Sequence, residues 1–540
     1  MESIIKTYNE RLERGQDVYS SKYEEMANSE KAYRQIMPDD IMEQSTMQSI
    51  DENASKFLFP AVTIVAEKIK KELSVNNPQF LIKGTTKVGE AIQKEFEDKI
   101  AYFFSSGNWG FKSNFAYHYL VTKGTMVTRT IMKRRMETIL TDNGVEQIGG
   151  GSPTIDIISY DPMTVVPDYD ADPKNWSETA KWCIITIGYY SANTIKQMFP
   201  KIKQQVSDFN TGWGSDIDIP KRYEMELSGK DLTTTGNIPV REYYTNDGWI
   251  HTIVNDSEIV ESRVNDLGLV GKMPINICPL KPDPNNVFGF THWHFLKNTV
   301  ACASRVMNQV LDNNELNNEF PLLAMKGADL EVKELGDGGR KVLEVNLPMG
   351  MKLDNIIQQM TFREITNGAQ FLFNITNMLI QQITGITNES LGVRERQMRV
   401  AGEAEIINRA ILTNSSDIVL SLENSYINPT IWDMFRIFYR NFEAFKFKSI
   451  SKEFLTNFEE VRVANGSTLS EDKINKQQLA QILAQIAGAY PNAANIPEVL
   501  KFYMSAFGAP SPEKFINSPE QLMAMQQGMS LAQRRVINNG

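Results

Sequence analysis

Three long segments of helical periodicity between residues 286 and 445 constrain the fold more than any other feature of this sequence. The first covers 293–318 and would form a helix about 40 Å long at 1.5 Å per residue. The second covers 353–384, and the third begins at Glu403. Apolar side chains of the first segment fall on one side of the helix: Leu296, Val300, Val306, Val310 and Leu311.

The segments between these helices are equally informative. Residues 321–352 alternate and turn at a Gly-Asp-Gly-Gly sequence, which predicts a small hairpin-like insert at the tip of a helical hairpin. The third helix meets Asn428-Pro429, where it must kink or restart. Gly368 falls inside the second helix and costs about 1 kcal/mol there relative to alanine. We therefore expect a bend or a close packing contact at Gly368.

Residues 1–285 have the pattern of an α+β unit. Helical periodicity covers most of 1–50, 57–73, 87–105 and 111–123, and the first of these helices is polar enough to be a peripheral arm packed on another element or subunit. From Thr125 the period changes to two, which predicts antiparallel strands. Near the other end, the sequence FEEVRVANGS predicts a strand pair, followed by helices.

Composition limits the classes of function. A chain of 540 residues predicts two to four structural units. The net charge of −10 excludes a globally basic nucleic-acid binder, but not a local basic contact or a channel that a polyanion passes without adhering. The three cysteines are far apart, which favours reduced, buried thiols. Apolar runs are about half the length of a membrane span, and no signal peptide is recognisable, so we expect an intracellular protein without a membrane segment.

Motifs that carry catalytic chemistry are weak here. GTTKVGEA (84–91) has the glycine spacing of a phosphate loop but lacks the Lys-Ser/Thr that grips phosphate, so a turn before a helix is the better interpretation. His292 and His294 are two residues apart and point to different sides of a helix, which argues against a shared metal. The run DYDADP (168–173) lacks the glycine and glutamate of a calcium loop and is interpreted as a solvated turn. We expect no catalytic residue, metal or cofactor, and therefore no enzyme.

Arg394, Arg396 and Arg399 lie within six residues, in a glycine-bounded loop between long helices. In a monomer this pattern is typical of a solvated loop. In a ring the same loop would repeat around the axis and could contact DNA phosphates without reading bases. Both interpretations stay open at this point.

An ordered series of segments resembles the portal (head-to-tail connector) proteins of tailed bacteriophages, of the podovirus-like type. The similar segments include KFLFPAVTIVAEKIKKEL, YLVTKGTMVTR, NNVFGFTHWHFLKNTVACASRVMNQVLDN, ITGITNESLGVRERQMRVAGEAEIINRA and VRVANGSTLSEDKINKQQLAQIL. The resemblance covers roughly residues 55–510. It implies an α+β portal fold assembled as a ring, in which each chain has a helical part, a wing β-sheet, two stem helices, a clip and a crown.

The resemblance also implies boundaries for these parts. They are an N-terminal helical arm (1–55), the wing (56–290), the first stem helix (291–320), the clip (321–352), the second stem helix (353–384), the tunnel loop (385–402), a long wing helix (403–445), and the crown with the C-terminal tail (446–540). It places Arg394, Arg396 and Arg399 on a DNA-facing loop. Residues expected at the stem interface between subunits are Leu296, Val300, Val306, Val310, Ile357, Leu372 and Leu379.

The function implied is that of a homododecameric channel at one capsid vertex, through which the genome is packaged and ejected. Expected partners are further copies of the chain, double-stranded DNA bound non-specifically, the terminase motor, tail adaptors, and the major capsid and scaffolding proteins, with no membrane. The expected location is the portal vertex of the virion, after assembly in the host cytoplasm. The alternatives are another virion structural protein, such as a tail or capsid component, or a divergent DNA-processing enzyme.

Overall fold

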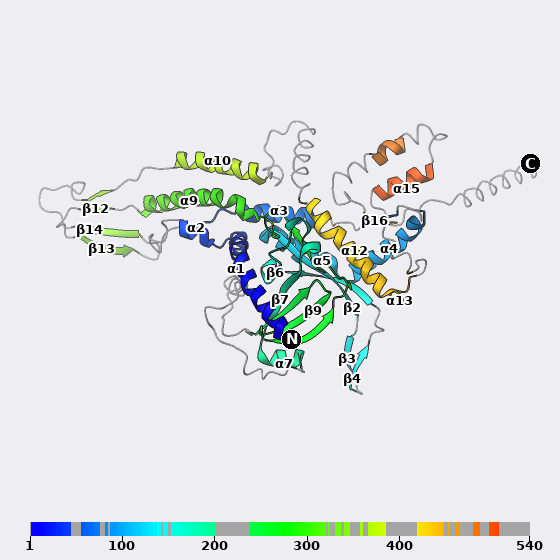
Figure 1. The fold of residues 1–540 in the computed structure, drawn as a ribbon. Coiled ribbons are helices and arrows are strands. Elements are labelled where there is room, and N and C mark those ends of the chain that lie inside the picture. The colour runs from blue at the N-terminus through cyan, green and yellow to red at the C-terminus, as the bar shows by residue number, and fades with distance from the viewer. Residues whose placement is uncertain are drawn as a thin grey trace, which may run out of the picture.

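Mixed helices and antiparallel sheets form a body from which two long helices, α9 (His292–Glu319) and α10 (Thr366–Thr384), project to one side (Figure 1). The structure is a computed structural model. It describes residues 2–44, 56–75, 82–84, 87–134, 137–141, 144–148, 153–200, 202, 238–319, 322–324, 330–335, 340–345, 357–359, 366–384, 418, 420–447, 452, 461–463, 479–485 and 496–506.

The other helices are distributed over the body. They are α1 (Glu2–Tyr33), α2 (Asp39–Gln44), α3 (Ala61–Val75), α4 (Lys87–Ser106), α5 (Trp109–Lys123), α6 (Trp176–Thr179), α7 (Ala192–Met198), α12 (Asn428–Arg440), α13 (Phe442–Phe445) and α15 (Ile496–Ala506). Two 3₁₀ turns, η2 (Pro162–Thr164) and η3 (Pro173–Asn175), and a π-helical turn, η6 (Glu423–Ile427), complete the set. None of the helices in these described ranges is long and apolar enough to cross a bilayer.

The strands form antiparallel sheets. The largest has the order β10-β9-β8-β7-β6, from β6 (Val165–Pro167), β7 (Trp182–Tyr190), β8 (Ile238–Thr245), β9 (Trp249–Val254) and β10 (Glu258–Val264). A three-stranded sheet has the order β11-β2-β5, from β2 (Thr125–Arg134), β5 (Pro153–Tyr160) and β11 (Asn276–Pro279). Two-stranded pairs join β1 (Ile82–Gly84) to β16 (Val461–Val463), β3 (Glu137–Thr141) to β4 (Gly144–Ile148), β12 (Leu322–Ala324) to β15 (Ile357–Gln359), and β13 (Leu330–Leu335) to β14 (Arg340–Val345).

Helix α1 packs on the five-stranded sheet of its own chain. Tyr8 and Tyr23 are fully buried against this sheet, and the Tyr23 hydroxyl donates a 2.8 Å hydrogen bond to the carbonyl oxygen of Val165. Arg11 donates a hydrogen bond to the Tyr243 hydroxyl on β8. The polar N-terminal helix is therefore an arm that packs on another element, as expected, and that element belongs to the same subunit.

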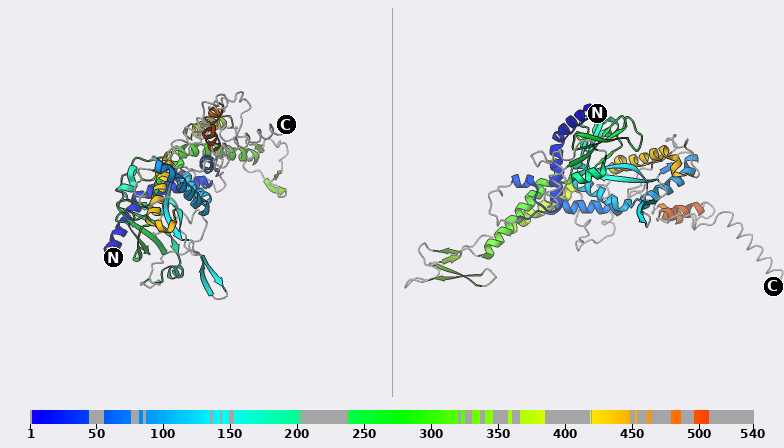
Figure 2. Two further views of the ribbon diagram at one scale, coloured as in Figure 1. Left: turned by 90° about the vertical axis from the view of Figure 1, so that its right-hand side faces the viewer. Right: turned by 90° about the horizontal axis from the view of Figure 1, so that it is seen from below.

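The second core lies between α4, α5, α12 and the three-stranded sheet. Aromatic side chains dominate it, and Phe96 of α4 lies edge-on to Phe435 of α12 with ring centroids 4.7 Å apart. Figure 2 shows α12 running alongside α4 on the body, on the side away from the projecting helices. Edge-to-face aromatic contacts add about 1 kcal/mol each beyond area burial, so α12 is anchored firmly.

A buried ionic group joins the two sheets. Arg129 of β2 donates to Glu242 of β8 at 3.1 Å, to the Tyr244 hydroxyl at 2.6 Å and to Asp266 at 2.6 Å. Burial would lower the pKa of Arg129, but the surrounding phenol and carboxylates outweigh it and raise that pKa. Each charge in the group has a partner, and these pairings offset the cost of removing the charges from water at the junction.

Several expected elements differ in extent. The second long helix begins at Thr366, not at 353, and Ile357 lies in strand β15. Gly368 consequently sits in the first turn of α10, where an added Cβ would meet nothing within 4 Å, so the expected close contact is wrong. The strand at 461–463 pairs with β1 rather than with a neighbour in sequence. The expected kink or restart at Asn428-Pro429 takes the form of a π-helical turn, η6, that leads directly into α12 with Pro429 in its first turn.

Candidate functional site

The projecting helix pair is the most distinctive surface feature of the chain. Helix α9 runs outward from the body for 28 residues, and α10 returns along it for 19 residues. The views in Figures 1 and 2 both place the pairs β12–β15 and β13–β14 at the far end. The structure therefore contains a helical hairpin with a small β tip, as the periodicity and the Gly-Asp-Gly-Gly turn predicted.

The base of α9 is part of the chain's own core. Trp293, Leu296 and Val300 are buried in a cluster with residues of α3 such as Val62, and with Ile380 of α10. Leu296 and Val300 were expected to contact a neighbouring subunit, and this expectation is wrong, since neither side chain retains any exposed area in the single chain.

Further along α9, the expected interface residues are covered to different degrees. Val306 is buried, and Val310 is half-buried. Helix α10 packs along α9, and the base of the stripe is covered by α3 and by Ile380 of α10, so this part of the stripe is buried within one chain. Only Leu311, at 40% exposure, offers much of its side chain to a partner.

Helix α10 carries apolar side chains on two sides. Thr376 and Ile380 are buried toward the body, and Phe373 lies 5.5 Å from the Phe59 ring in an edge-to-face contact. The exposed apolar side chains of this helix, which we name the α10 face, are Phe371 (66%), Leu372 (45%), Met378 (51%), Leu379 (41%) and Ile383 (38%).

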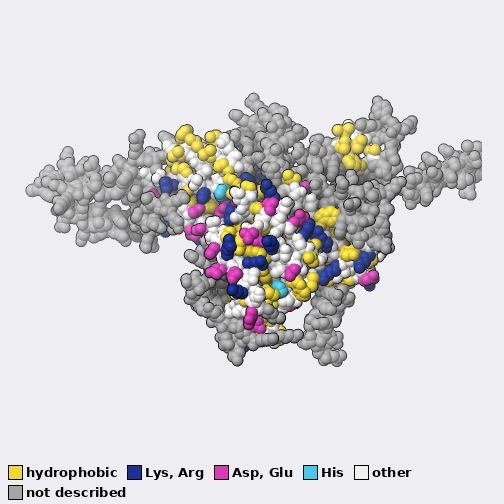
Figure 3. Space-filling model, in the orientation of Figure 1, with side chains coloured by type: hydrophobic (Ala, Val, Ile, Leu, Met, Phe, Trp, Pro, Cys, Tyr) yellow, Lys and Arg dark blue, Asp and Glu magenta, His cyan; other side chains and the backbone are white. Residues whose placement is uncertain are grey.

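The α10 face is an exposed apolar surface. Phe371 and Met378 are seven residues apart, as are Leu372 and Leu379, so each pair lies along one line of the helix, and the two lines are about 100° apart around its axis. Figure 3 shows the corresponding hydrophobic cluster on the upper left of the molecule, over α10. Apolar surface gathered in this way marks a site of protein contact. Leu372 and Leu379 were predicted as contact residues from the sequence. Phe371, Met378 and Ile383 were not, although the sequence shows that this helix has apolar residues on more than one side.

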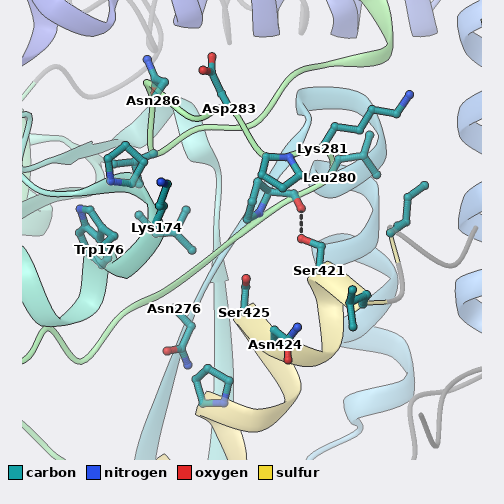
Figure 4. Close-up of a pocket in the computed structure, with 18 of the residues that line it drawn as sticks. Lys174, Trp176, Asn276, Leu280, Lys281, Asp283, Asn286, Ser421, Asn424 and Ser425 are labelled. Atoms are coloured by element: carbon teal, nitrogen blue, oxygen red, sulfur yellow. Dashed lines mark hydrogen bonds between the residues drawn. The ribbon is translucent and has the colours of Figure 1, made fainter. Parts of the chain in front are cut away.

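A hollow of about 1020 Å³ lies at the base of the helix pair, between β11, the turn η3–α6 and the helix around η6. Figure 4 shows Ser421, Asn424 and Ser425 on that helix, and Asn276 on the adjoining strand. The Ser421 hydroxyl donates a 2.6 Å hydrogen bond to the carbonyl oxygen of Pro279, drawn as a dashed line (Figure 4). This bond ties the turn of helix before η6 to the edge strand β11.

Two titratable groups are buried near this hollow. Burial, together with the nearby Lys281, lowers the pKa of His292 to about 3, so its imidazole is neutral at physiological pH. Burial raises the pKa of Asp433 to about 6, although Arg436 at 2.7 Å and the Asn276 amide at 3.1 Å favour the charged form. Both groups occupy packing positions on α9 and α12.

The histidine pair at the start of α9 is a helix-start feature. His292 is buried, whereas the exposed His294 lies 3.6 Å from Glu25 of α1. Glu25 also accepts hydrogen bonds from the Thr291 backbone and hydroxyl at 3.2 and 2.8 Å. Through the described part of the chain, no three His, Cys, Asp or Glu side chains gather as they would around a metal ion.

Two other expectations need correction. Cys183 and Cys278 are buried thiols, and burial raises the pKa of both, but Cys302 on α9 is exposed. In the acidic run at 168–173, Asp168 is buried and accepts backbone hydrogen bonds from Asp170 and Lys181 at 3.1 and 2.8 Å. The run is a turn with Asp170 and Asp172 exposed, as expected, and only the buried Asp168 departs from the expected solvated turn.

The arginines of the expected DNA-facing loop, Arg394, Arg396 and Arg399, lie outside the described residues. The side chain of Ile357 is likewise not described. The site that the structure supports is therefore the α10 face with the helix pair that carries it. Comparison with models of known protein families gives no match to this chain, and comparison with curated proteins gives none either.

Proposed function

We propose that the chain is the portal protein of a tailed bacteriophage, and that its copies form the ring-shaped DNA channel at one capsid vertex. The observation that supports this most directly is the projecting pair α9–α10, with an exposed apolar face along α10 and a β tip at its end. A long apolar face directed away from its own body is useful to a subunit that packs side by side with copies of itself.

A ring needs an interface in which one patch meets a different patch on the next copy. In the proposed ring the α10 face is one of these patches, and it packs against the neighbour's helix pair. The β tip then becomes the clip that docks the terminase motor and tail adaptors. Arg394, Arg396 and Arg399 contact DNA phosphates, and the energy for packaging comes from the separate motor, because we propose that this chain is not an enzyme.

Electron micrographs of the purified protein test the proposal most directly. Rings of about twelve subunits with a central channel support it. A monomer at micromolar concentration, or a shell-like lattice, contradicts it and favours another virion structural protein. Magnesium-dependent DNA cleavage or ATP hydrolysis by the same preparation would instead favour the DNA-processing enzyme.

A further inference from the structure

A basic stretch lies on the body, in the segment 436–452. Its sequence, RIFYRNFEAFKFKSISK, contains five lysine or arginine residues and one acidic residue, in a chain whose net charge is −10. The concentration of positive charge in 17 residues of an acidic protein is the pattern expected of a local contact with a polyanion.

The fold directs this charge to one side. Phe435, Phe438 and Phe445 are buried in the core below α12 and α13. Other side chains of this segment reach the surface, and we name as the basic ridge the partly exposed Arg436 and the exposed Tyr439, Arg440, Lys446 and Lys452. Figure 3 shows dark-blue side chains gathered on the right of the visible face, where Figure 1 places α12 and α13.

Two guanidinium groups of the basic ridge are held in place. Arg440 donates a hydrogen bond to the carbonyl oxygen of Asn265 and lies against Gly268. Arg436 is fixed by its 2.7 Å bond to Asp433. A guanidinium has five N–H groups, so these bonds orient each fork and leave it able to donate to a further anion.

The ridge also has an aromatic component. Tyr439 is 40% exposed, and the Lys452 ammonium lies 5.2 Å from the centre of its ring. Arg436 and Arg440 are one helical turn apart, about 6 Å along the axis of α12. The result is a row of cations along α12 and past its end, in which Arg436 is paired with the buried Asp433 and Glu443 adds an exposed carboxylate.

We propose that the basic ridge binds the phosphate backbone of double-stranded DNA on the outer surface of the protein, without reading sequence. Oriented guanidinium forks match phosphate oxygens better than flexible ammonium groups do, which favours a phosphate polymer over an acidic protein. The inference does not depend on the ring proposed above, because the ridge belongs to the body of a single chain and not to the helix pair.

Binding of the full-length protein to relaxed closed-circular plasmid DNA tests this proposal. A closed circle offers no end to thread through a channel, so its binding reports the outer surface. The test variant is Arg440→Gln/Lys446→Gln/Lys452→Gln. The control variant, Lys6→Gln/Lys181→Gln/Lys196→Gln, removes the same charge from three exposed lysines elsewhere on the body.

We expect the test variant to bind the circle at least about tenfold more weakly at 50 mM salt, and to lower the slope of log affinity against log salt by about 2–3. The control should bind as the unmodified protein does, and all three proteins should unfold at similar temperatures. An equal loss of DNA affinity in the test and control variants would overturn the proposal, because net charge alone would then explain the loss. It is also overturned if the unmodified protein prefers polyglutamate to the circle, which would indicate an acidic protein partner.

Failure of this proposal is distinguishable from failure of the portal proposal. Micrographs report the ring whether or not the ridge binds DNA. Conversely, a monomer that binds the closed circle through the ridge would support the ridge and contradict the ring.

Discussion

The indole N–H of Trp293, at the start of α9, donates a 2.9 Å hydrogen bond to the carboxylate of Asp40 in α2. This bond ties the base of the projecting helix pair to the N-terminal arm. Burial raises the pKa of Asp40, and the indole bond counteracts that shift. In the folded protein, the hydrogen bond from Trp293 therefore offsets part of the cost of burying the charged form of Asp40.

We expect Trp293→Phe to lower the free energy of unfolding by about 2 kcal/mol, because a partly buried carboxylate loses its donor. Asp40→Asn is the matched control, since its amide oxygen can still accept from the indole, and it should cost less. Urea unfolding of both variants measures the difference. A loss for Trp293→Phe no larger than that for Asp40→Asn would contradict this contribution of the bond.

Gly124 ends α5 with a φ of 69°, and an added Cβ would lie 2.6 Å from the carbonyl oxygen of Phe290. Gly124→Ala should therefore be destabilised both by the left-handed backbone, at about 1–2 kcal/mol, and by this clash. Gly271→Ala is the control, with a φ of 80° and nothing within 4 Å. Thermal unfolding should show a clearly larger loss of stability for Gly124→Ala than for Gly271→Ala. Similar losses of stability would mean that the added Cβ moves away from the Phe290 carbonyl at no cost.

Much of the fold follows from local pattern. Periods of 3.6 and 2 located α9 and the strands of both sheets, because these elements have one buried side each. The pairing of β1 with β16 could not be predicted, since it joins residues about 380 positions apart and local sequence carries no record of the partner. The start of α10 was misplaced for a similar reason. An apolar run around Ile357 suits a strand as well as a helix, and tertiary pairing decides which forms.

The candidate site was predicted less well. The periodicity placed Leu296 and Val300 on one apolar stripe, but their expected contact with a neighbouring subunit was wrong, because local sequence does not say whether the partner lies in the same chain. Phe371 and Met378 show the converse. They lie in a helix that is apolar on both sides, and only the structure shows which side the body covers.

His292 and Asp433 oppose each other in the dependence of stability on pH. The pKa of His292 falls from 6.5 to about 3, so the folded protein loses stability as pH drops below 6.5. The pKa of Asp433 rises from 3.8 to about 6, so the folded protein gains stability as pH drops through 6 toward 4. Between pH 6 and 4 the two contributions largely cancel.

Asp433→Asn should remove the contribution that offsets the effect of His292 on stability at acidic pH. On acidification from pH 6.5 to 4, we expect the variant to lose up to about 3 kcal/mol more than the unmodified protein, at 1.36 kcal/mol per pKa unit. Urea titrations at a series of pH values measure the difference. Parallel pH profiles for the two proteins would show that Asp433 is not protonated in the folded state over this range.

We expect the side chains of Arg394, Arg396 and Arg399 to contact DNA and to contribute nothing to ring assembly. Replacing all three with glutamine should leave the ring intact in micrographs, while linear duplex DNA retained in the ring becomes more accessible to nuclease. The control replaces Lys6, Lys181 and Lys196, which keeps the charge change equal. Loss of the ring in the arginine variant would instead assign this loop a structural role.

We expect the α10 face to form part of the contact between neighbouring subunits of the ring. Phe371→Gln/Met378→Gln/Leu379→Gln should leave the fold of the single chain unchanged, because these side chains are 66%, 51% and 41% exposed. The ring should dissociate, since each copy loses apolar area worth about 25 cal/mol per Å² buried at the contact. Native mass spectrometry and micrographs measure the change. The control Val18→Gln/Met198→Gln/Val270→Gln replaces three other exposed apolar side chains and should assemble normally. Intact rings in the α10 variant would place the contact between subunits on a different surface.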